Sequence, residues 1–355
     1  MSRPLLATID AAALKHNLEV VRKHAPRSRV LAVVKANAYG HGLMRAASAL
    51  SAAEGYAVVE LDSAVRLREA GYRQRILLLE GWFEAAELPV FVQHGIAAVV
   101  HSRDQIGMMS GLRRGAALDV YVKLNSGMNR LGFEPGALPA VVAELKQHPA
   151  VNSVTLMTHF AAADEARGVA WQMQALDRVA NGLVLPRSLA NSAAILRHPE
   201  THADWVRPGI MLYGCSPFSG QTGMELDLEP AMTLESRVIA IQNLKIGDTV
   251  GYGGTFTAER STRVGIVACG YADGYPRHAP TGTPVMVEGR VTRTVGRVSM
   301  DMLCADLSEI PEAGTGSRVV LWGDGLPVER VADAAGTIGY QLLCALAPRV
   351  RIAEK

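Results

Sequence analysis

The chain has 355 residues, of which 49% are hydrophobic and 20% are charged, and its formal net charge is +2. This length allows more than one domain and a sizeable core. The small net charge and the scattered basic residues give no electrostatic reason to expect nucleic acid or an anionic membrane as a partner.

The cysteines and the apolar pattern favour a cytoplasmic protein. Four cysteines lie far apart without a CxxC motif, so we expect reduced thiols. The N-terminal residues lack the apolar stretch of an export signal, and no run of 18 apolar residues predicts a membrane span. No metal site is expected, because Pro199 separates His198 from His202, and the pair reads as two surface histidines in a loop.

The first two thirds of the chain alternate apolar strands with amphipathic helices. A short strand is predicted at residues 3–9, and Asp10 is a suitable N-cap for a helix at 11–24. Eight strand cores follow, at residues 30–34, 56–59, 75–79, 97–100, 118–122, 153–157, 186–190 and 204–206. Eight βα units in about 200 residues predict a (β/α)8 barrel. A doubly wound open sheet is the alternative, but no GxGxxG follows the first strand.

Polar residues stand where these strands end. They are Lys35, Glu60, Glu80, His101, Lys123, His159, Asn191 with Ser192, and Arg207. The carboxyl ends of barrel strands converge on one face, where such barrels place their chemistry. Lys35 follows the buried run at 30–34, and an ammonium at that depth is costly unless it is paired, deprotonated or covalently used.

The pattern changes after Tyr213. Residues 216–230 are rich in Gly, Pro and Ser and are predicted to form a connector. From Ala231 the sequence is β-like, with a hairpin turn at Glu288-Gly289 and two short helices near 328–335 and 339–346. We therefore predict a barrel domain at 10–225 and a mostly β domain at 226–355, which the strand within residues 1–9 joins as a further hypothesis.

Eight motifs occur in an order that identifies a family. They are VVKANAYGHG (33–42), KLNSGMNRLGF (123–133), THFA (158–161), NSAAILRHP (191–199), WVRPGIMLYG (205–214), VGYGGTF (250–256), GYADGYPR (270–277) and SMDM (299–302). Over essentially its whole length the chain resembles the bacterial alanine racemases, pyridoxal-phosphate enzymes with a barrel and a β domain. The resemblance implies interconversion of L- and D-alanine in a homodimer with shared active sites.

The resemblance also implies a cofactor site. Lys35 corresponds to the lysine that forms the internal aldimine, and Arg207 to the arginine that faces the pyridine nitrogen. An arginine there keeps its proton, which favours return of the proton to the α-carbon over transamination. The cofactor-binding residues implied are Lys35, Tyr39, Arg130, His159, Ser192, Arg207, Gly209 and Tyr340, of which Tyr39, Ser192, Gly209 and Tyr340 hold the phosphate.

Two groups on opposite faces of the substrate are implied as acid–base catalysts after alanine joins the cofactor as an external aldimine. They are Lys35 and Tyr252, the latter supplied by the partner subunit and supported by a relay through His159 to Arg207. Arg130 and the Met300 N–H are implied to bind the substrate carboxylate. Lys123 matches a position that carries a carbamate in this family.

The remaining implications concern access and biological role. Tyr340 and Tyr252 narrow the entrance, which favours a small side chain, and the outer approach is lined by Tyr271, Asp164, Arg277 and Arg297. Family members serve D-alanine biosynthesis or L-alanine breakdown, and the overall likeness leans to the catabolic type. The alternatives are another racemase or a decarboxylase of the same fold, a non-catalytic pyridoxal-phosphate carrier, which lacks the β domain, and a cofactor-free aldolase.

Overall fold

The computed structural model describes residues 3–355, and contacts divide the chain into two compact units. One unit comprises Leu18–Ala38 and Gly42–Leu212, and we call it the barrel unit. The other comprises the segment up to Asn17, Tyr39–His41 and Tyr213–Lys355, and we call it the sheet unit. Residues 1 and 2, part of the predicted N-terminal strand segment, lie outside the described residues.

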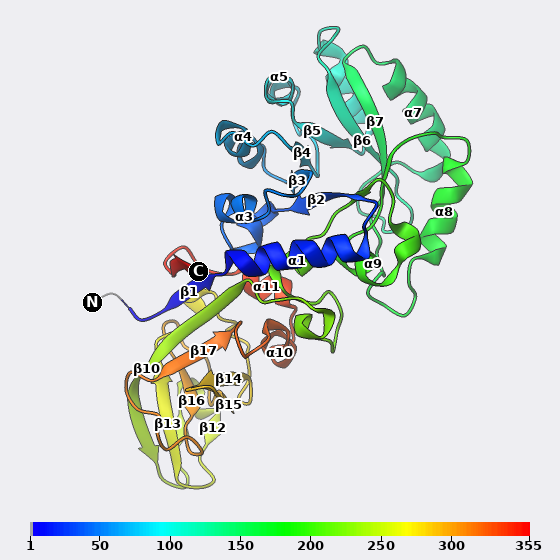
Figure 1. The fold of residues 1–355 in the computed structure, drawn as a ribbon. Coiled ribbons are helices and arrows are strands. Elements are labelled where there is room, and N and C mark those ends of the chain that lie inside the picture. The colour runs from blue at the N-terminus through cyan, green and yellow to red at the C-terminus, as the bar shows by residue number, and fades with distance from the viewer. Residues whose placement is uncertain (1–2) are drawn as a thin grey trace. The chain divides into compact units, whose positions relative to one another are not determined.

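The barrel unit confirms the predicted fold class. Within residues 3–355, eight parallel strands close into a barrel in chain order (Figure 1). They are β2 (Arg29–Val33), β3 (Gly55–Val58), β4 (Arg75–Leu78), β5 (Ala97–Val100), β6 (Leu118–Lys123), β7 (Val151–Met157), β8 (Arg187–Ser188) and β9 (Trp205–Val206). The strands form continuous apolar runs because parallel strands under helices are buried on both faces.

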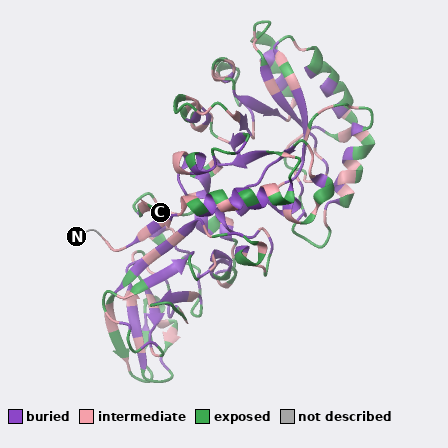
Figure 2. Ribbon diagram, in the orientation of Figure 1, coloured by how far each residue is buried: buried purple, intermediate pink, exposed green. Residues whose placement is uncertain are grey.

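Helices connect the barrel strands and bury one side each. They are α3 (Leu43–Ala49), α4 (Leu61–Glu69), α5 (Leu88–His94), α6 (Arg103–Met108), α7 (Leu138–Gln147), α8 (Ala170–Ala180) and α9 (Ser192–Arg197). In α7 the buried residues are Leu138, Val141, Val142 and Leu145, which is helical spacing for one apolar stripe. Figure 2 shows the same alternation of buried and exposed residues along several helices.

Helix α1 (Ala11–His24) begins where the sequence predicts. Asp10 Oδ1 accepts hydrogen bonds from the backbone N–H groups of Ala12 at 2.9 Å and Ala13 at 3.1 Å, which confirms its role as N-cap. Among the described residues, no helix combines the length and apolar composition that a bilayer crossing requires.

The sheet unit is built on a mixed eight-stranded sheet in the part of the chain that the structure describes. Its strands are β1 (Leu6–Ile9), β10 (Met232–Leu244), β13 (Thr262–Val267), β14 (Pro284–Val287), β15 (Arg290–Arg293), β16 (Leu303–Asp306), β17 (Arg318–Trp322) and β18 (Arg351–Glu354). Strand β1 pairs antiparallel with β10 and parallel with β18. Helices α10 (Val328–Ala334) and α11 (Gly339–Cys344) lie near the predicted positions.

Two turns in the sheet unit have clear causes. Glu288 and Gly289 both have positive φ, 47° and 77°, and join β14 to β15 as the predicted hairpin turn. A second hairpin joins β11 (Thr249–Val250) to β12 (Phe256–Thr257). Its Val250 packs with Val264 and Val295 in a hydrophobic cluster that also includes Phe256, so the base of this hairpin is fixed by apolar burial.

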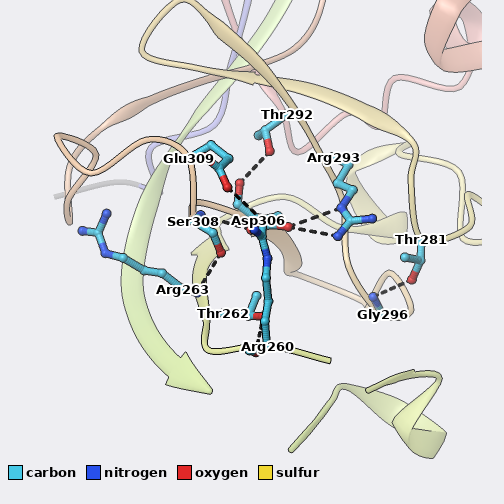
Figure 3. A network of polar contacts seen from close by, with 10 residues as sticks. All are labelled: Arg260, Thr262, Arg263, Thr281, Thr292, Arg293, Gly296, Asp306, Ser308 and Glu309. Atoms are coloured by element: carbon cyan, nitrogen blue, oxygen red, sulfur yellow. Dashed lines mark hydrogen bonds and ion pairs between the residues drawn. The ribbon is translucent and has the colours of Figure 1, made fainter. Parts of the chain in front are cut away.

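A polar network stabilises the strands beside that cluster (Figure 3). The Asp306 carboxylate accepts from the Arg293 guanidinium, with Nη2 at 3.2 Å, and from the Ser308 backbone N–H at 3.1 Å. These hydrogen bonds lower the pKa of Asp306 against the opposing effect of burial, which is the largest single influence. Thr281 Oγ1 accepts from the Gly296 N–H at 2.9 Å and fixes the residue that precedes Arg297.

Candidate active site

The barrel unit places the predicted strand-end residues on the carboxyl side of its strands. Lys35, Glu60 and Glu80 each follow the last residue of their strand by two positions, and His101 and Arg207 follow by one. Lys123 is the last residue of β6, and His159 follows β7 by two positions. The convergence expected from barrel topology is therefore present in the chain.

Lys35 opens a turn with rare backbone geometry. Residues 36–39 all have φ between 51° and 55°, so the chain forms a short left-handed helix, α2 (Lys35–Tyr39). Each non-glycine residue there costs roughly 1–2 kcal/mol, so surrounding contacts must stabilise the turn. One is the Asn37 side chain, whose Oδ1 accepts from the Leu43 N–H at 2.9 Å.

The expectation that Lys35 is a deeply buried amine is wrong. Its side chain is half-buried, because the strand ends at Val33, two residues before Lys35. Lys123 is the buried lysine, with an exposed fraction of 7%. Lys35 is therefore reachable from solvent, while Lys123 is enclosed.

Arg207 is held in the barrel by neutral acceptors. Its Nη1 donates to Ser188 Oγ at 2.8 Å, and its Nη2 donates to the Thr158 carbonyl at 2.7 Å and the Leu189 carbonyl at 3.2 Å. The side chain is buried, and burial lowers the pKa of Arg207 to about 10. The guanidinium therefore remains protonated near neutral pH, in a fixed orientation.

His159 lies beside this guanidinium. Arg207 Nη2 lies 3.5 Å from His159 Nδ1. Burial, followed by the positive charge of Arg207, holds the pKa of His159 well below its usual value, so the ring is neutral. Because a guanidinium has no acceptor, Nδ1 must accept the hydrogen bond and the ring proton resides on Nε2. His159 can therefore donate from Nε2.

Lys123 completes a cluster of cations. Burial lowers the pKa of Lys123 to about 8, with further lowering from Arg207, Arg130 and Lys35 and partial compensation from Glu80. A small cavity is lined by Lys123, Arg130 and His159 together with residues of the 124–131 loop. The excess of positive charge around this cavity suits an anionic occupant.

Ser192 and Gly209 form a compact donor site on the same unit. The Gly209 N–H donates to Ser192 Oγ at 2.9 Å, and Ser192 is the first residue of α9. Asn191 caps this helix by accepting from the Ala194 N–H at 3.1 Å. Because Ser192 Oγ accepts from Gly209, the Ser192 O–H is the group that can donate to an anionic oxygen, and the glycine permits close approach.

In the sheet unit, Tyr39 lies in an aromatic cluster. Its ring stacks on Tyr213 with centroids 4.6 Å apart, and the Tyr340 ring is 6.1 Å away. Burial, followed by the nearby Cys344 thiol, raises the pKa of the Tyr39 phenol, so the hydroxyl keeps its proton. Gly40 has φ of 81°, and a Cβ there would collide with the Leu343 carbonyl, so only glycine fits.

Tyr252 projects from the hairpin between β11 and β12. Its exposed fraction is 70%, although the hairpin base is packed in the Val250 cluster. Gly251 and Gly253, with φ of 72° and 73°, form the turn on either side. A Cβ added at Gly253 would lie 3.5 Å from Arg297 Nη1, so Arg297 lies against the same turn.

Met300 lies on a loop that is bonded to the GYADG segment. The Tyr271 N–H donates to the Ser299 carbonyl, and the Ala272 N–H donates to the Met300 carbonyl, both at 3.0 Å. A Cβ at Gly270 would collide with both carbonyls, so the close approach requires glycine. Met300 itself is 52% exposed.

A buried aspartate anchors these two loops. Asp273 accepts from Arg349 Nε at 2.7 Å, from Arg3 Nη1 at 2.6 Å and from the Gly270 N–H at 2.9 Å. Arg349 also pairs with Asp301 in the Met300 loop at 2.6 Å, and Arg3 donates to the Asp301 carbonyl. The backbone around Met300 is thus fixed by charge pairing.

The outer-approach residues are exposed, in both units. Asp164 lies on the loop after β7 of the barrel unit. In the sheet unit, the Arg277 guanidinium lies 5.9 Å from the centroid of the Tyr271 ring. His198 and His202, predicted as surface histidines in a loop, are half-buried, and each places Nε2 within hydrogen-bonding distance of a backbone carbonyl, that of Ala163 and Ile195 respectively.

Several supporting residues escaped the sequence analysis. Tyr213 lies inside a recognised motif but gave no sign of the stacking role it has. Asp273 also lies inside a motif, where it is one acidic residue among several. Gln172 lies in the first turn of α8 and is fully buried, which no local pattern of the sequence signals.

The closed barrel with a lysine, a histidine and a buried arginine at its strand ends, followed by a mostly β unit, defines a two-domain α/β-barrel enzyme class. Family models for the alanine racemase N-terminal and C-terminal domains match residues 9–217 and 231–353. The chain belongs to the alanine racemase family, as the sequence resemblance indicated.

Relatives of known name and structure span the whole chain. The alanine racemase of Nitrosospira multiformis is 63% identical over 354 residues, covering 99% of each chain. The catabolic alanine racemase of Klebsiella aerogenes is 53% identical, again covering 99% of each. The crystal structure of biosynthetic alanine racemase from Pseudomonas aeruginosa matches with a TM-score of 0.95 and 48% identity, covering 100% of each chain. Catabolic and biosynthetic relatives are thus similarly close.

Proposed function

We propose that this protein is an alanine racemase that uses pyridoxal 5'-phosphate and is active as a homodimer with shared sites. The observation that carries the proposal is the Arg207–His159 contact at 3.5 Å inside a barrel whose strand ends also bear Lys35 and Lys123. The family relatives supply the substrate class. We assign cofactor binding to the barrel, residues 10–225, and the second proton-transfer group to residues 226–355.

The residues present fit this cofactor. When bound, pyridoxal phosphate withdraws electrons from the α-carbon of the amino acid and so acidifies its hydrogen. We assign Lys35 as the attachment point, since it follows the end of β2 and its side chain is only half-buried. The cation cluster of Lys35, Lys123, Arg130 and Arg207 is partly offset by Glu80, which suits a ligand with anionic groups.

The phosphate is assigned to two groups of donors. In the barrel unit, Ser192 Oγ and the Gly209 N–H already lie within 2.9 Å of each other. In the sheet unit we assign the same role to Tyr39 and Tyr340, whose phenol groups share one aromatic cluster. Arg207 is assigned to the ring nitrogen, where it donates a hydrogen bond and keeps its proton.

Racemisation requires a proton to leave one face of the α-carbon and another proton to arrive on the opposite face. We assign the two faces to Lys35 and to Tyr252 of a second copy, because a single base cannot reach both without crossing the substrate plane. The 70% exposure of Tyr252 in one chain supports a role at a surface that another subunit completes. Neither group alone would invert the configuration.

A tyrosine needs assistance to act as a base near neutral pH, since a phenol ordinarily titrates near 10. Lowering its pKa by two to three units requires about 3–4 kcal/mol of preferential stabilisation of the phenolate. Neutral His159 carries its proton on Nε2, and Arg207 fixes the opposite nitrogen. His159 is thus ready to donate to the Tyr252 oxygen and stabilise its charged form.

Substrate orientation is assigned to Arg130 and the Met300 N–H, two donors for one carboxylate. Arg130 follows β6 on the loop that lines the small cavity, and Met300 lies on the loop anchored through Asp273. Tyr340 and Tyr252 are assigned to the inner entrance, where rigid rings favour a methyl side chain. Tyr271, Asp164, Arg277 and Arg297 are assigned to the outer approach.

Lys123 is assigned as a carbamate. Its pKa of about 8 leaves a useful fraction of neutral amine near physiological pH, which is the form that reacts with carbon dioxide. The ammonium first loses one proton to become the amine, and formation of the N–C bond with carbon dioxide releases a second proton, so a cation becomes an anion. The product would accept hydrogen bonds from Arg130 and remove the repulsion within the cluster.

The deciding experiment mixes the reconstituted protein with L-alanine in deuterium oxide. We expect the circular dichroism of the amino acid to decay to zero while deuterium enters the α-position. Lysine, arginine and serine serve as alternative substrates that separate this proposal from a broader racemase. Carbon dioxide release from any of them, without loss of optical activity from alanine, would instead indicate a decarboxylase.

A further inference from the structure

A fully buried glutamine supports both members of the Arg207–His159 pair. Gln172 lies in α8, and its exposed fraction is 0%. Its Oε1 accepts from the Ala161 N–H at 2.7 Å, and its Nε2 donates to the His159 carbonyl at 3.1 Å and to Ser126 Oγ at 2.8 Å. The amide orientation is determined by these partners, because one is a donor and two are acceptors.

The contact with Ser126 continues toward Arg207. Thr158 Oγ1 donates to the Leu124 carbonyl at 3.0 Å, so the 2.7 Å contact between Ser126 and Thr158 requires Ser126 to donate. The hydrogen bonds therefore run in one direction, from Gln172 to Ser126 to Thr158. The carbonyl of Thr158 is the acceptor that holds Arg207 Nη2 at 2.7 Å.

We infer that Gln172 is a positioning residue for the proton relay. It fixes the two peptide groups that directly follow His159 and, through Ser126, the residue that orients the Arg207 guanidinium. This inference rests on the proposed function, because it concerns the half-reaction assigned to Tyr252. A displacement of the relay should impair proton transfer on the tyrosine face more than on the Lys35 face.

The barrel contains a matched glutamine at another strand end. Gln105 of α6 is 4% exposed, and its Nε2 donates to the carbonyls of Glu80 at 2.9 Å and Trp82 at 3.1 Å. Its Oε1 accepts from the His101 N–H at 2.8 Å. Gln105→Met and Gln172→Met therefore each lose three hydrogen bonds of the same kind, but only Gln172 contacts the relay.

The test compares α-hydrogen exchange of L-alanine and of D-alanine in deuterium oxide, at saturating cofactor and substrate. Exchange of the α-hydrogen without inversion reports proton transfer on one face of the substrate at a time. The racemisation rates in the two directions cannot do this, because the equilibrium constant of one ties their kcat/KM values together. In Gln172→Met we expect L-alanine exchange to fall roughly tenfold, in line with misplacement of catalytic groups, and D-alanine exchange to change by less than about twofold. In Gln105→Met the ratio of the two should stay at its wild-type value.

A second readout does not depend on turnover. In protein labelled with ¹⁵N-histidine and free of cofactor, the ring signals of His159 are assigned by their absence in His159→Asn. We expect these signals to shift in Gln172→Met and to remain in place in Gln105→Met. An unchanged exchange ratio with unmoved His159 signals would overturn the inference.

Two further variants keep the outcomes separate. If Gln172→Met does not fold, Gln172→Glu retains the acceptor for the Ala161 N–H and removes the donor to the His159 carbonyl, so the same selective loss is expected. Tyr252→Phe tests the face assignment itself. If Tyr252→Phe loses L-alanine exchange selectively and neither Gln172 variant does, the inference about Gln172 fails and the proposed function stands. If Tyr252→Phe loses exchange of both isomers equally, the proposed function fails.

Discussion

The two units hold their candidate functional groups in opposite ways. In the barrel unit, Arg207 and Lys123 are buried, His159 is half-buried, and Arg207 is oriented by hydroxyl and carbonyl oxygens. In the sheet unit, Tyr252 and Met300 are mainly exposed, while the anchor beneath the Met300 loop is a buried carboxylate between two arginines. The barrel unit thus contains a buried cluster of cations, whereas the sheet unit carries exposed candidate groups on loops that buried contacts fix.

This contrast explains why a single chain leaves part of the proposed machinery in solvent. Buried charge without a counter-ion is costly, so an excess of cations favours an anionic ligand in the barrel. An exposed tyrosine on a well-packed hairpin has a defined position without a function of its own in the monomer. In the proposed homodimer, a second subunit would supply the surface that this tyrosine faces.

The largest effect is expected from a substitution that removes the proposed catalytic group of the sheet unit. Tyr252→Phe removes one hydroxyl and is expected to reduce L-alanine α-hydrogen exchange by about 10²–10⁴, the range for loss of a general acid–base group. D-alanine exchange should persist, because Lys35 serves that face. Deuterium incorporation followed by NMR measures both exchange rates.

Tyr56→Phe is the control, since this phenol donates to the Ala47 carbonyl at 2.8 Å in the barrel interior. Equal losses of exchange for both isomers in Tyr252→Phe would contradict the assignment of faces.

The second prediction concerns the anchor of the Met300 loop. Asp273→Asn leaves Arg3 and Arg349 facing a neutral amide and is expected to destabilise the protein by about 3 kcal/mol, typical for removing one partner of a buried pair. Chemical denaturation followed by circular dichroism measures the loss. Because the loop loosens, the KM for alanine should rise more than kcat falls.

An exposed ion pair in the same unit provides the control for Asp273. Glu309 accepts from Arg260 at 2.9 Å, and both side chains are more than 60% exposed. Glu309→Gln is expected to change stability by less than about 1 kcal/mol, because solvent screens such pairs. Similar losses in the two variants would mean that burial of Asp273 has no energetic consequence.

Much of this arrangement could be predicted from sequence for topological reasons. Parallel strands must end on one face of a barrel, so the polar residues at the strand ends from Lys35 to Arg207 could be predicted to gather on that face. The N-cap at Asp10 and the Glu288-Gly289 turn were predictable because each depends on residues within a few positions.

Other features depend on partners that are distant in sequence and left no local pattern. The left-handed turn after Lys35 uses Ala36, Asn37 and Ala38, residues whose usual preference is for negative φ. Strand β16 (Leu303–Asp306) has only four residues, which is too short for an alternation of apolar and polar residues to be recognised beside the SMDM motif. The role of Gln172 depends on acceptors 13 and 46 positions away, and helical periodicity reveals neither.

The smallest predicted effect concerns the buried cation cluster of the barrel unit. Lys123→Met, in cofactor-free protein and buffer without carbon dioxide, is expected to increase stability at pH 7 by about 2 kcal/mol, because it removes a charge from a buried site while preserving packing. The folded pKa of Lys123 is about 8, below the usual value near 10.5. Between these values the unfolded wild-type chain binds more protons, so wild-type stability rises with pH.

The advantage of Lys123→Met should therefore be complete below pH 8 and disappear as the pH approaches about 10.5. Urea unfolding at several pH values measures this difference. Lys146→Met on the exposed side of α7 is the control and should show no such trend. If Lys123→Met remains more stable than the wild type at high pH, the substitution acts by packing rather than by removing a charge. If the stability difference disappears at pH 8 when bicarbonate is added, the Lys123 amine has become an anion that Arg130 can pair with.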